Sequence, residues 1–364
     1  MSPAQPIASS SAGHVVARLE FTGTGADYFR IWVAHTLLTL LTVGVYSAWA
    51  KARRERWFSR HTRLMGDAFN YHGRPNRIFT GRLLAVIGYL VLSHAPEWSV
   101  TGGLLLLALF IATGPVFLGS ALRFRARNMS WRGARFDFDA SARDVYLACL
   151  PVLVLLTMSP MLLLVRAAPV ITHSAAILTV LIWPGVHASL KALQHRSTRL
   201  GATRFDFKSA TVAFYGLYGK AVLLVFVLSL TLGWLVKTRS SLHGAASVTL
   251  MLTLICLYLI VWPYYTVRMQ QLVWSHTTYG DIRFKVEIRT TALWQLIGRN
   301  LVLILLTAGI YWPFAAVAMA RFRVESLSLS SRAPLPEALR TATAAQTRPL
   351  GDAVADLFGI DVGW

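Results

Sequence analysis

Long apolar stretches without charged residues dominate the pattern of hydrophobic and polar positions along this chain. A helix of about 20 apolar residues crosses roughly 30 Å of hydrocarbon. No polar stripe typical of an amphipathic soluble helix interrupts these stretches. The pattern therefore predicts an all-α polytopic membrane protein with about eight transmembrane helices. The candidate stretches are 31–50, 83–96, 100–122, 145–165, 170–190, 221–236, 244–267 and 301–320.

Composition and the placement of charge support an integral membrane protein that crosses the bilayer several times. Of the 364 residues, 55% are hydrophobic and only 14% are charged, which does not describe a soluble surface. A net charge of +20 would suggest nucleic acid in a soluble protein. Here 26 of the 36 Lys and Arg fall in five segments that border the apolar stretches, so we expect these segments to be cytoplasmic and expect no nucleic-acid partner.

A short pattern recurs in four of the basic segments. Each instance has threonine or a substitute near its start, a glycine near its middle and alternating apolar side chains at its end, over residues 61–71, 128–138, 197–207 and 276–286. Alternation around a glycine predicts a β-hairpin. We therefore expect four short cytoplasmic β-hairpins within a repeat-built transmembrane domain. That domain covers 18–330, between a disordered N-terminal tail (1–17) and a polar C-terminal tail (331–364).

The first and last apolar stretches resemble each other. Leu41-Thr-x-Gly44-Val-Tyr46 corresponds to Leu306-Thr-x-Gly309-Ile-Tyr311. Two topologies follow. If both stretches cross the bilayer, as their length favours, there are eight spans. If both bend back near Gly44 and Gly309, there are six spans plus two re-entrant segments, an arrangement that the arginines just after residue 320 favour.

Several motifs resemble the YjgN-like family of bacterial inner-membrane proteins. They include Phe21-Thr-Gly-Thr-Gly, Gly44-x-Tyr-x-x-Trp-Ala-Lys51, Trp274-Ser-His-Thr277 and the tail beginning Leu350-Gly-Asp352. The likeness extends over nearly the whole chain but departs from the family at Ala48, where proline is common. The resemblance implies a polytopic inner-membrane protein whose family has no established substrate, cofactor or catalytic residue.

Motifs for catalysis and cofactor binding are absent from the sequence. It contains no HExxH, P-loop or G-x-S-x-G motif, and its two cysteines, Cys149 and Cys256, lie in apolar stretches. We therefore expect no enzyme activity, no metal site and no cofactor. No carboxylate lies inside a charge-free stretch, which disfavours proton-coupled transport.

Three basic residues at the edges of apolar stretches are the candidate ligand site. Arg30, Lys220 and Arg299 either extend to lipid headgroups or hold an anionic headgroup or solute. Glycine breaks such as Gly44 and Gly309 mark binding sites in repeat-built carriers. The sequence therefore favours a protein that binds or transports a small or lipidic, anionic molecule. The alternative is a non-catalytic membrane scaffold or regulatory protein that uses its hairpins as a docking surface.

The three-residue candidate site is testable by lipid analysis. Replacing Arg30, Lys220 and Arg299 together with glutamine should lower the anionic lipid retained by the purified protein, because each change removes a positive charge near the headgroups. Native mass spectrometry measures the retained lipid. Unchanged retention would exclude these residues as the lipid site.

Overall fold

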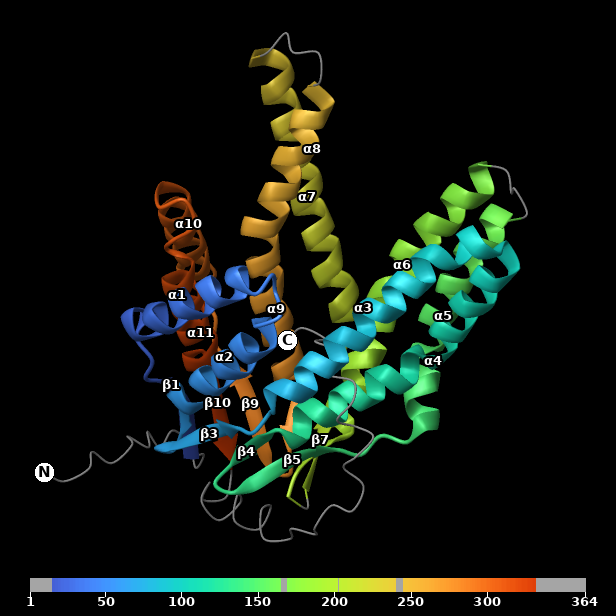
Figure 1. The fold of residues 1–364 in the computed structure, drawn as a ribbon. Helices are drawn as coiled ribbons and strands as arrows, with labels where there is room; N and C mark the ends of the chain where they lie inside the picture. The colour runs from blue at the N-terminus through green and yellow to red at the C-terminus, as the bar shows by residue number, and fades with distance from the viewer. Residues whose placement is uncertain (1–14, 165–168, 202, 240–244, 332–364) are drawn as a thin grey trace, which may run out of the picture.

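The computed structural model describes residues 15–164, 169–201, 203–239 and 245–331. Within these residues, ten short strands form a closed barrel, and helices extend from one end of it (Figure 1). Neighbouring strands are antiparallel in the order β1-β10-β9-β8-β7-β6-β5-β4-β3-β2. The strands are β1 (Val15–Phe21), β2 (Thr62–Leu64), β3 (Asp67–Tyr71), β4 (Met129–Trp131), β5 (Ala134–Phe138), β6 (Thr198–Leu200), β7 (Thr203–Phe207), β8 (Thr277–Tyr279), β9 (Ile282–Val286) and β10 (Leu327–Ser331).

Four hairpins supply eight of these strands, at the places that the sequence predicts. The β2–β3, β4–β5 and β8–β9 pairs each join across a two-residue turn, and β6 pairs with β7 in the same antiparallel way. The predicted glycines lie in these turns with positive φ, at Gly66, Gly133, Gly201 and Gly280. This backbone conformation suits tight hairpins and is easiest for glycine.

Long helices alternate with the hairpins and occupy the opposite layer (Figure 1). Among the described helices, five are long and apolar enough to cross a membrane, over Pro75–Ala95, Val100–Arg127, His173–Arg196, Thr211–Thr238 and Ser247–Ser275. The helices between the hairpins are α3 (Pro75–Trp98), α4 (Val100–Arg127), α5 (Ala142–Leu164), α6 (Pro169–Arg196), α7 (Thr211–Arg239), α8 (Ala245–Cys256) and α9 (Trp262–Ser275).

Local sequence explains several helix boundaries. The Ser99 side chain caps α4 by accepting a hydrogen bond from the backbone N–H of Gly102. Between α8 and α9, a short π-helical segment (η1, Leu257–Val261) immediately precedes Trp262 and Pro263. Proline lacks the N–H that would continue the regular hydrogen-bond ladder, which is a common cause of such local distortions.

The first and last apolar stretches do not form single spanning helices. The first divides into α1 (Gly25–Leu41) and α2 (Ser47–His61), and the last into α10 (Thr290–Leu306) and α11 (Trp312–Glu325). The backbone reverses at Gly44 and Gly309, whose φ angles are 88° and 91°. Because β1 pairs with β2, and β9 with β10, each helix pair leaves the barrel and returns to it. The expectation that both stretches cross the bilayer is therefore wrong.

The predicted all-α fold class is also wrong. The hairpins do not stand as separate cytoplasmic features, because they pair with one another and with β1 and β10 into the closed barrel. The physical reason is that an isolated two-stranded hairpin is marginal in water and has two unpaired edges. β1 begins at Val15, inside the predicted N-terminal tail. The rest of that tail and residues 332–364 lie outside the described residues.

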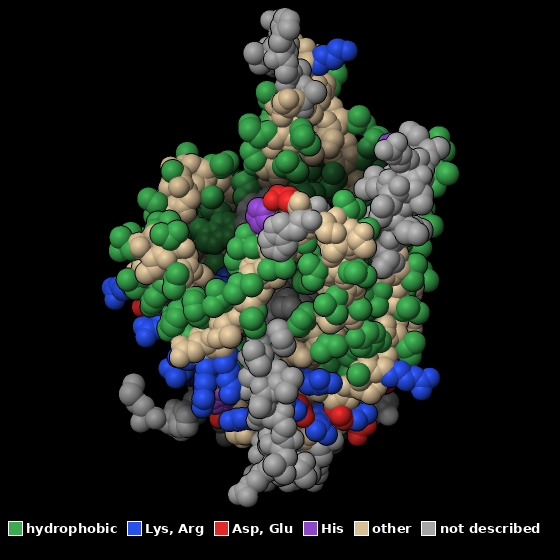
Figure 2. All heavy atoms as spheres, turned by 45° about the vertical axis from the view of Figure 1, so that its right-hand side comes forward, with side chains coloured by type: hydrophobic (Ala, Val, Ile, Leu, Met, Phe, Trp, Pro, Cys, Tyr) green, Lys and Arg blue, Asp and Glu red, His purple; other side chains and the backbone are tan. Residues whose placement is uncertain are grey.

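Side chains of one type gather in bands on the surface (Figure 2). Hydrophobic side chains cover the helical layer, and Lys and Arg side chains gather where the helices meet the barrel. The apolar tip between α1 and α2 is strongly exposed, with Leu41 at 78% and Val43 at 93%. Exposed apolar helices above a basic band are the arrangement expected of a protein embedded in a bilayer.

Closure of the barrel between its first and last strands is testable with a disulfide. Val16 and Ser330 are partners in the β1–β10 ladder. Antiparallel partners have Cα atoms about 4.5–5.5 Å apart, which a disulfide tolerates. After both native cysteines are changed to alanine, oxidised Val16→Cys/Ser330→Cys protein should migrate faster on a non-reducing gel. Pairing Val16→Cys with Thr203→Cys, on β7, is the control. Equal migration of the two oxidised pairs would contradict closure.

Candidate ligand-binding cavity

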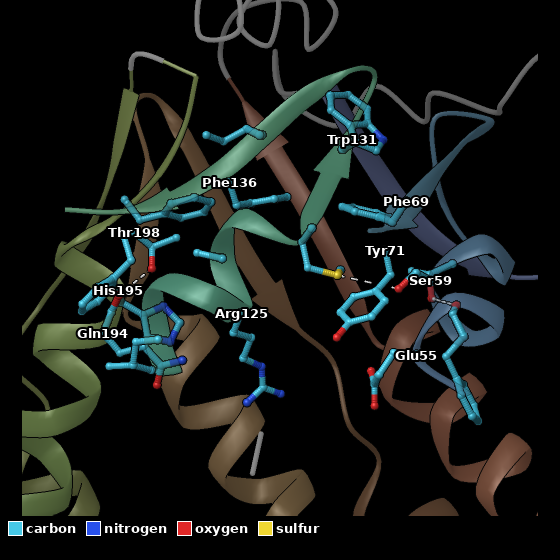
Figure 3. Close-up of a pocket in the computed structure, with 18 of the residues that line it drawn as sticks. Glu55, Ser59, Phe69, Tyr71, Arg125, Trp131, Phe136, Gln194, His195 and Thr198 are labelled. Atoms are coloured by element: carbon cyan, nitrogen blue, oxygen red, sulfur yellow. Dashed lines mark hydrogen bonds between the residues drawn. The ribbon is translucent and has the colours of Figure 1, made fainter. Parts of the chain in front are cut away.

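A cavity of about 520 Å³ lies inside the barrel and extends toward the helix ends (Figure 3). Its volume is within the range of small-molecule binding sites. Small barrels either fill their interior with side chains or hold one small ligand. This barrel does both, because part of its interior is packed and part is hollow.

The packed part lies at the hairpin turns, at the end of the barrel far from the helices. Four side chains beside these turns, Leu64, Trp131, Leu200 and Tyr279, form one buried cluster. Tyr279 donates a hydrogen bond of 2.8 Å to the backbone oxygen of Leu200. Burial raises the pKa of Tyr279 to about 12, so its hydroxyl stays protonated. The cluster closes one end of the barrel with neutral groups.

The walls of the cavity are mainly apolar and aromatic. Strand residues alternate between the inside and the outside of a barrel. The apolar positions that alternate along the hairpin strands line the inside, at Phe69, Tyr71, Phe136, Phe138, Phe205 and Phe284. The predicted alternation of apolar side chains at the end of each hairpin is therefore confirmed, and six of these eight side chains line the cavity.

Polar side chains form a rim where the helices enter the barrel. Lys51 and Glu55 come from α2, Arg125 comes from α4, and Gln194 and His195 come from α6. In Figure 3, Arg125 lies between the Gln194–His195 pair on one side and Glu55 on the other. The cavity therefore joins an apolar chamber to a charged rim.

Hydrogen bonds hold the α6 side of this rim in place. Gln194 and His195 are only 8% and 4% exposed. Nδ1 of His195 lies 3.2 Å from the Thr277 hydroxyl oxygen, and the Lys191 ammonium donates to Oε1 of Gln194 at 3.3 Å. The Thr198 hydroxyl donates to the Gln194 backbone oxygen at 2.6 Å. Buried polar groups are costly unless they are paired, so these contacts fix the side chains that face the cavity.

Ion pairs reinforce the outer face of the wall between β5 and β6. Asp137 accepts hydrogen bonds from Nε of Arg127 and Nη2 of Arg199, both at 2.9 Å. Burial alone would raise the pKa of Asp137, but the hydrogen bonds from Arg199 and Arg127 outweigh it and hold that pKa below its ordinary value. The neighbours of Asp137, Phe136 and Phe138, face inward. The charged network therefore supports the aromatic wall from outside.

The candidate residues predicted from the sequence lie elsewhere. Arg30, Lys220 and Arg299 are exposed on three different helices, α1, α7 and α10, and none lines the cavity. Gly44 and Gly309 lie in the helix turns and also do not line it. The structure therefore does not gather the predicted ligand residues into one site, and their role in holding lipid stays a prediction.

Sequence reasoning missed the rim, although a signal for part of it was present. Counted back from the threonine position of the first three hairpins, the residues three and four positions earlier face the cavity. These positions hold Phe58 and Ser59 before Thr62, Arg125 and Ala126 before Met129, and Gln194 and His195 before Thr198. One helical turn separates them from the strand, so each helix end presents the same face to the barrel. Only a closed ring makes those faces converge.

Among the residues that the structure describes, the cysteines and potential metal ligands form no comparable site. Cys149 and Cys256 are free thiols. Within the described ranges, no group of three or more His, Cys, Asp or Glu side chains is arranged to hold a metal ion.

The fold and the cavity define a class: a protein with several helices long and apolar enough to cross a membrane, whose short strands close into a barrel around an amphipathic cavity. The chain belongs to the family described as "Bacterial protein of unknown function (DUF898)", which it matches over residues 16–357. The sequence-based resemblance to YjgN-like proteins is confirmed by curated relatives of that name.

These relatives are similar to the chain over part of its length. The inner membrane protein YjgN of Salmonella typhimurium is 33% identical over 143 residues, which is 38% of this chain and 36% of that protein. The inner membrane protein YjgN of Escherichia coli O157:H7 is 30% identical over 129 residues, 35% of this chain and 32% of that protein. The chain thus matches about a third of the length of these relatives. No solved structure matches.

The Asp137 network predicts a measurable loss of stability. Asp137→Asn should lower the free energy of unfolding by about 2 kcal/mol, because two charge-assisted hydrogen bonds are weakened. The pKa of Asp137 is lower in the folded protein than in the unfolded chain. The stabilisation that Asp137 gives is therefore fully present above the ordinary aspartate pKa, and it is lost as the pH falls through the lowered pKa of the folded state. Thermal unfolding in detergent, followed by circular dichroism, measures both effects.

The matched control for this variant is Asp206→Asn, at the equivalent position of the next hairpin. Asp206 is exposed, and its carboxylate accepts a hydrogen bond from the backbone N–H of Phe207. A loss as large for Asp206→Asn as for Asp137→Asn would show that the arginine network is not the cause.

Proposed function

We propose that this protein binds a lipidic anion, with the apolar part of the ligand in the barrel and its anionic group at the rim. The observation that carries this proposal is the division of one cavity into an aromatic chamber and a rim with Lys51 and Arg125. An apolar chain gains about 25 cal/mol for each Å² removed from water, and a carboxylate or phosphate gains charge-assisted hydrogen bonds. One molecule carrying both groups uses both parts of the cavity.

The position of the rim supports a ligand that comes from the bilayer. The rim residues come from the helices that enter the barrel, α2, α4 and α6. Figure 2 shows Lys and Arg side chains gathered below the apolar helical layer, and lipid headgroups attract such basic residues. The ligand's head then stays near the interface while its chain leaves the bilayer for the barrel. Binding at the rim requires no chemical step, so the proposal is a non-catalytic binding protein.

The cavity favours this proposal over a purely structural scaffold. A docking scaffold has no need for a hollow interior, and filling it with side chains would stabilise the barrel because packed interiors avoid voids. The hollow interior and the buried polar side chains at its rim both lower the stability of the folded protein, and a ligand-binding role accounts for their presence.

The proposal is testable with a fluorescent long-chain fatty acid and the fatty alcohol of equal length. Lys51→Gln/Arg125→Gln should bind the acid at least about tenfold more weakly, since a hydrogen bond to a charged group contributes about 1.5–3 kcal/mol. Binding of the uncharged alcohol should change little. Fluorescence titration of protein in detergent micelles measures both affinities.

A matched double variant controls for the loss of net charge. Arg53→Gln/Arg135→Gln removes the same charge from exposed positions on α2 and β5 that do not line the cavity. Two outcomes would contradict the proposed site. One is a loss of affinity for the acid in this control as large as in the rim variant. The other is an equal loss of affinity for the acid and for the alcohol in the rim variant.

A further inference from the structure

Five side chains close the bottom of the cavity, at the end of the barrel far from the helices. Each is the third residue of its strand, in β2, β4, β6, β8 and β10. All five are at most 6% exposed, belong to one buried cluster and line the cavity. We call this set the floor, and its members are Leu64, Trp131, Leu200, Tyr279 and Leu329.

A second set of five side chains lines the cavity above the floor. Each member pairs in register with one floor residue on the neighbouring strand, so both side chains project from the same face of the sheet, which is the inside. Four members are the third residue of a strand that follows a hairpin turn, so they lie farther from the turns than the floor does. We call this set the wall ring: Leu19, Phe69, Phe136, Phe205 and Phe284 are the partners of Leu64, Trp131, Leu200, Tyr279 and Leu329 in that order.

One backbone hydrogen bond recurs around the barrel, which makes the five floor positions geometrically equivalent. The N–H of the residue that follows one strand donates to the carbonyl oxygen of the residue that precedes the neighbouring strand, at 2.8 or 2.9 Å each time. The five bonds join Thr22 to His61, His72 to Asn128, Asp139 to Ser197, Lys208 to His276 and Glu287 to Ser326. A side chain that occupies one floor position is therefore a suitable replacement at another.

Trp131 is the largest floor residue, and three of the other four are leucine. It is 1% exposed, and its ring centroid lies 6.3 Å from that of its wall-ring partner, Phe69. The guanidinium carbon of Arg132 lies 4.6 Å from the Trp131 ring centroid in a cation–π contact, and Arg132 also forms an ion pair with Asp67. These contacts hold the indole in place. The floor consists of side chains, so its height depends on their size.

We propose that the floor limits the length of the ligand's apolar chain and that Trp131 is the main specificity-determining residue. This inference rests on the proposed lipidic-anion site and specifies its ligand further. With the anionic group at Lys51 and Arg125, the chain extends through the wall ring until its end meets the floor. Each buried methylene strengthens binding about fourfold, whereas a methylene beyond the floor has no space to enter.

Affinity should therefore rise with chain length and stop rising at one length, the chain-length limit. A series of saturated fatty acids in steps of two carbons, each displacing the fluorescent fatty acid from the protein in detergent micelles, measures this limit. Transfer of an acid out of the micelle is the same for every variant, so a difference in the limit between variants comes from the protein.

Trp131→Leu should raise the chain-length limit by at least about two carbons, because the surrounding structure fills only part of the space that the larger side chain leaves. The acid just beyond the native limit should then bind the variant about tenfold more tightly than the native protein. Trp234→Leu is the matched control. Trp234 is 68% exposed on α7 and does not line the cavity, so this variant should keep the native limit.

Leu19→Phe supplies an independent test in the opposite direction. It gives the wall ring a fifth phenylalanine and narrows the chamber, so the acid at the native limit should bind about tenfold more weakly. Circular dichroism reports whether each variant folds. If Trp131→Leu unfolds, the result with Leu19→Phe decides the proposal.

The possible outcomes separate this inference from the proposed function. A chain-length limit that is the same in the native protein, Trp131→Leu and Leu19→Phe would overturn the role of the floor, and fatty-acid binding itself would stand. An affinity that does not depend on chain length would overturn it as well. Failure of every acid to bind the native protein would instead refute the lipidic ligand on which this inference rests.

Discussion

The rest of this structure depends on the closure of the barrel, which is a matter of backbone hydrogen bonding. Most strands contain three to five residues, too few for any hairpin to be stable alone. In the ring, every strand has a neighbour on both sides, so no edge is left unpaired. The same pairing fixes where each helix leaves the barrel, and the helix ends then bring Lys51, Arg125 and His195 around one opening.

Local features of the fold could be predicted because they have local causes. Gly66 and Gly133 mark tight turns through their positive φ, and the alternation of Phe136 and Phe138 gives one face of a strand. The membrane class followed from apolar length alone. The glycine breaks at Gly44 and Gly309 also pointed to a reversal, although stretch length favoured crossing. Length was misleading because these stretches are each two short helices.

The barrel itself could not be predicted from the sequence, because its pairings are long-range. Phe21 pairs with Thr62, and Phe138 pairs with Thr198, with an entire helix pair between the partners in each case. Nothing in a three-residue strand such as Thr198–Leu200 identifies its distant neighbour. The site was missed for the same reason. In the sequence, Arg125 and Gln194 do not differ from other polar residues near helix ends, and only the closed ring brings them together. Arg30 and Arg299 are conspicuous in the sequence because each is a charge at the edge of an apolar stretch.

The pairing of β1 with β10 constrains how the molecule can be assembled during synthesis. The earliest barrel strand needs the latest one as its neighbour, while β2 and the hairpins emerge in between. During synthesis, successive helix pairs can enter the bilayer. The sheet beside them stays open, with an unpaired edge strand at each end, until β10 is made. A chain that stops before Leu327 lacks β10, so its sheet keeps two unpaired edge strands. These edges can pair with those of another truncated chain.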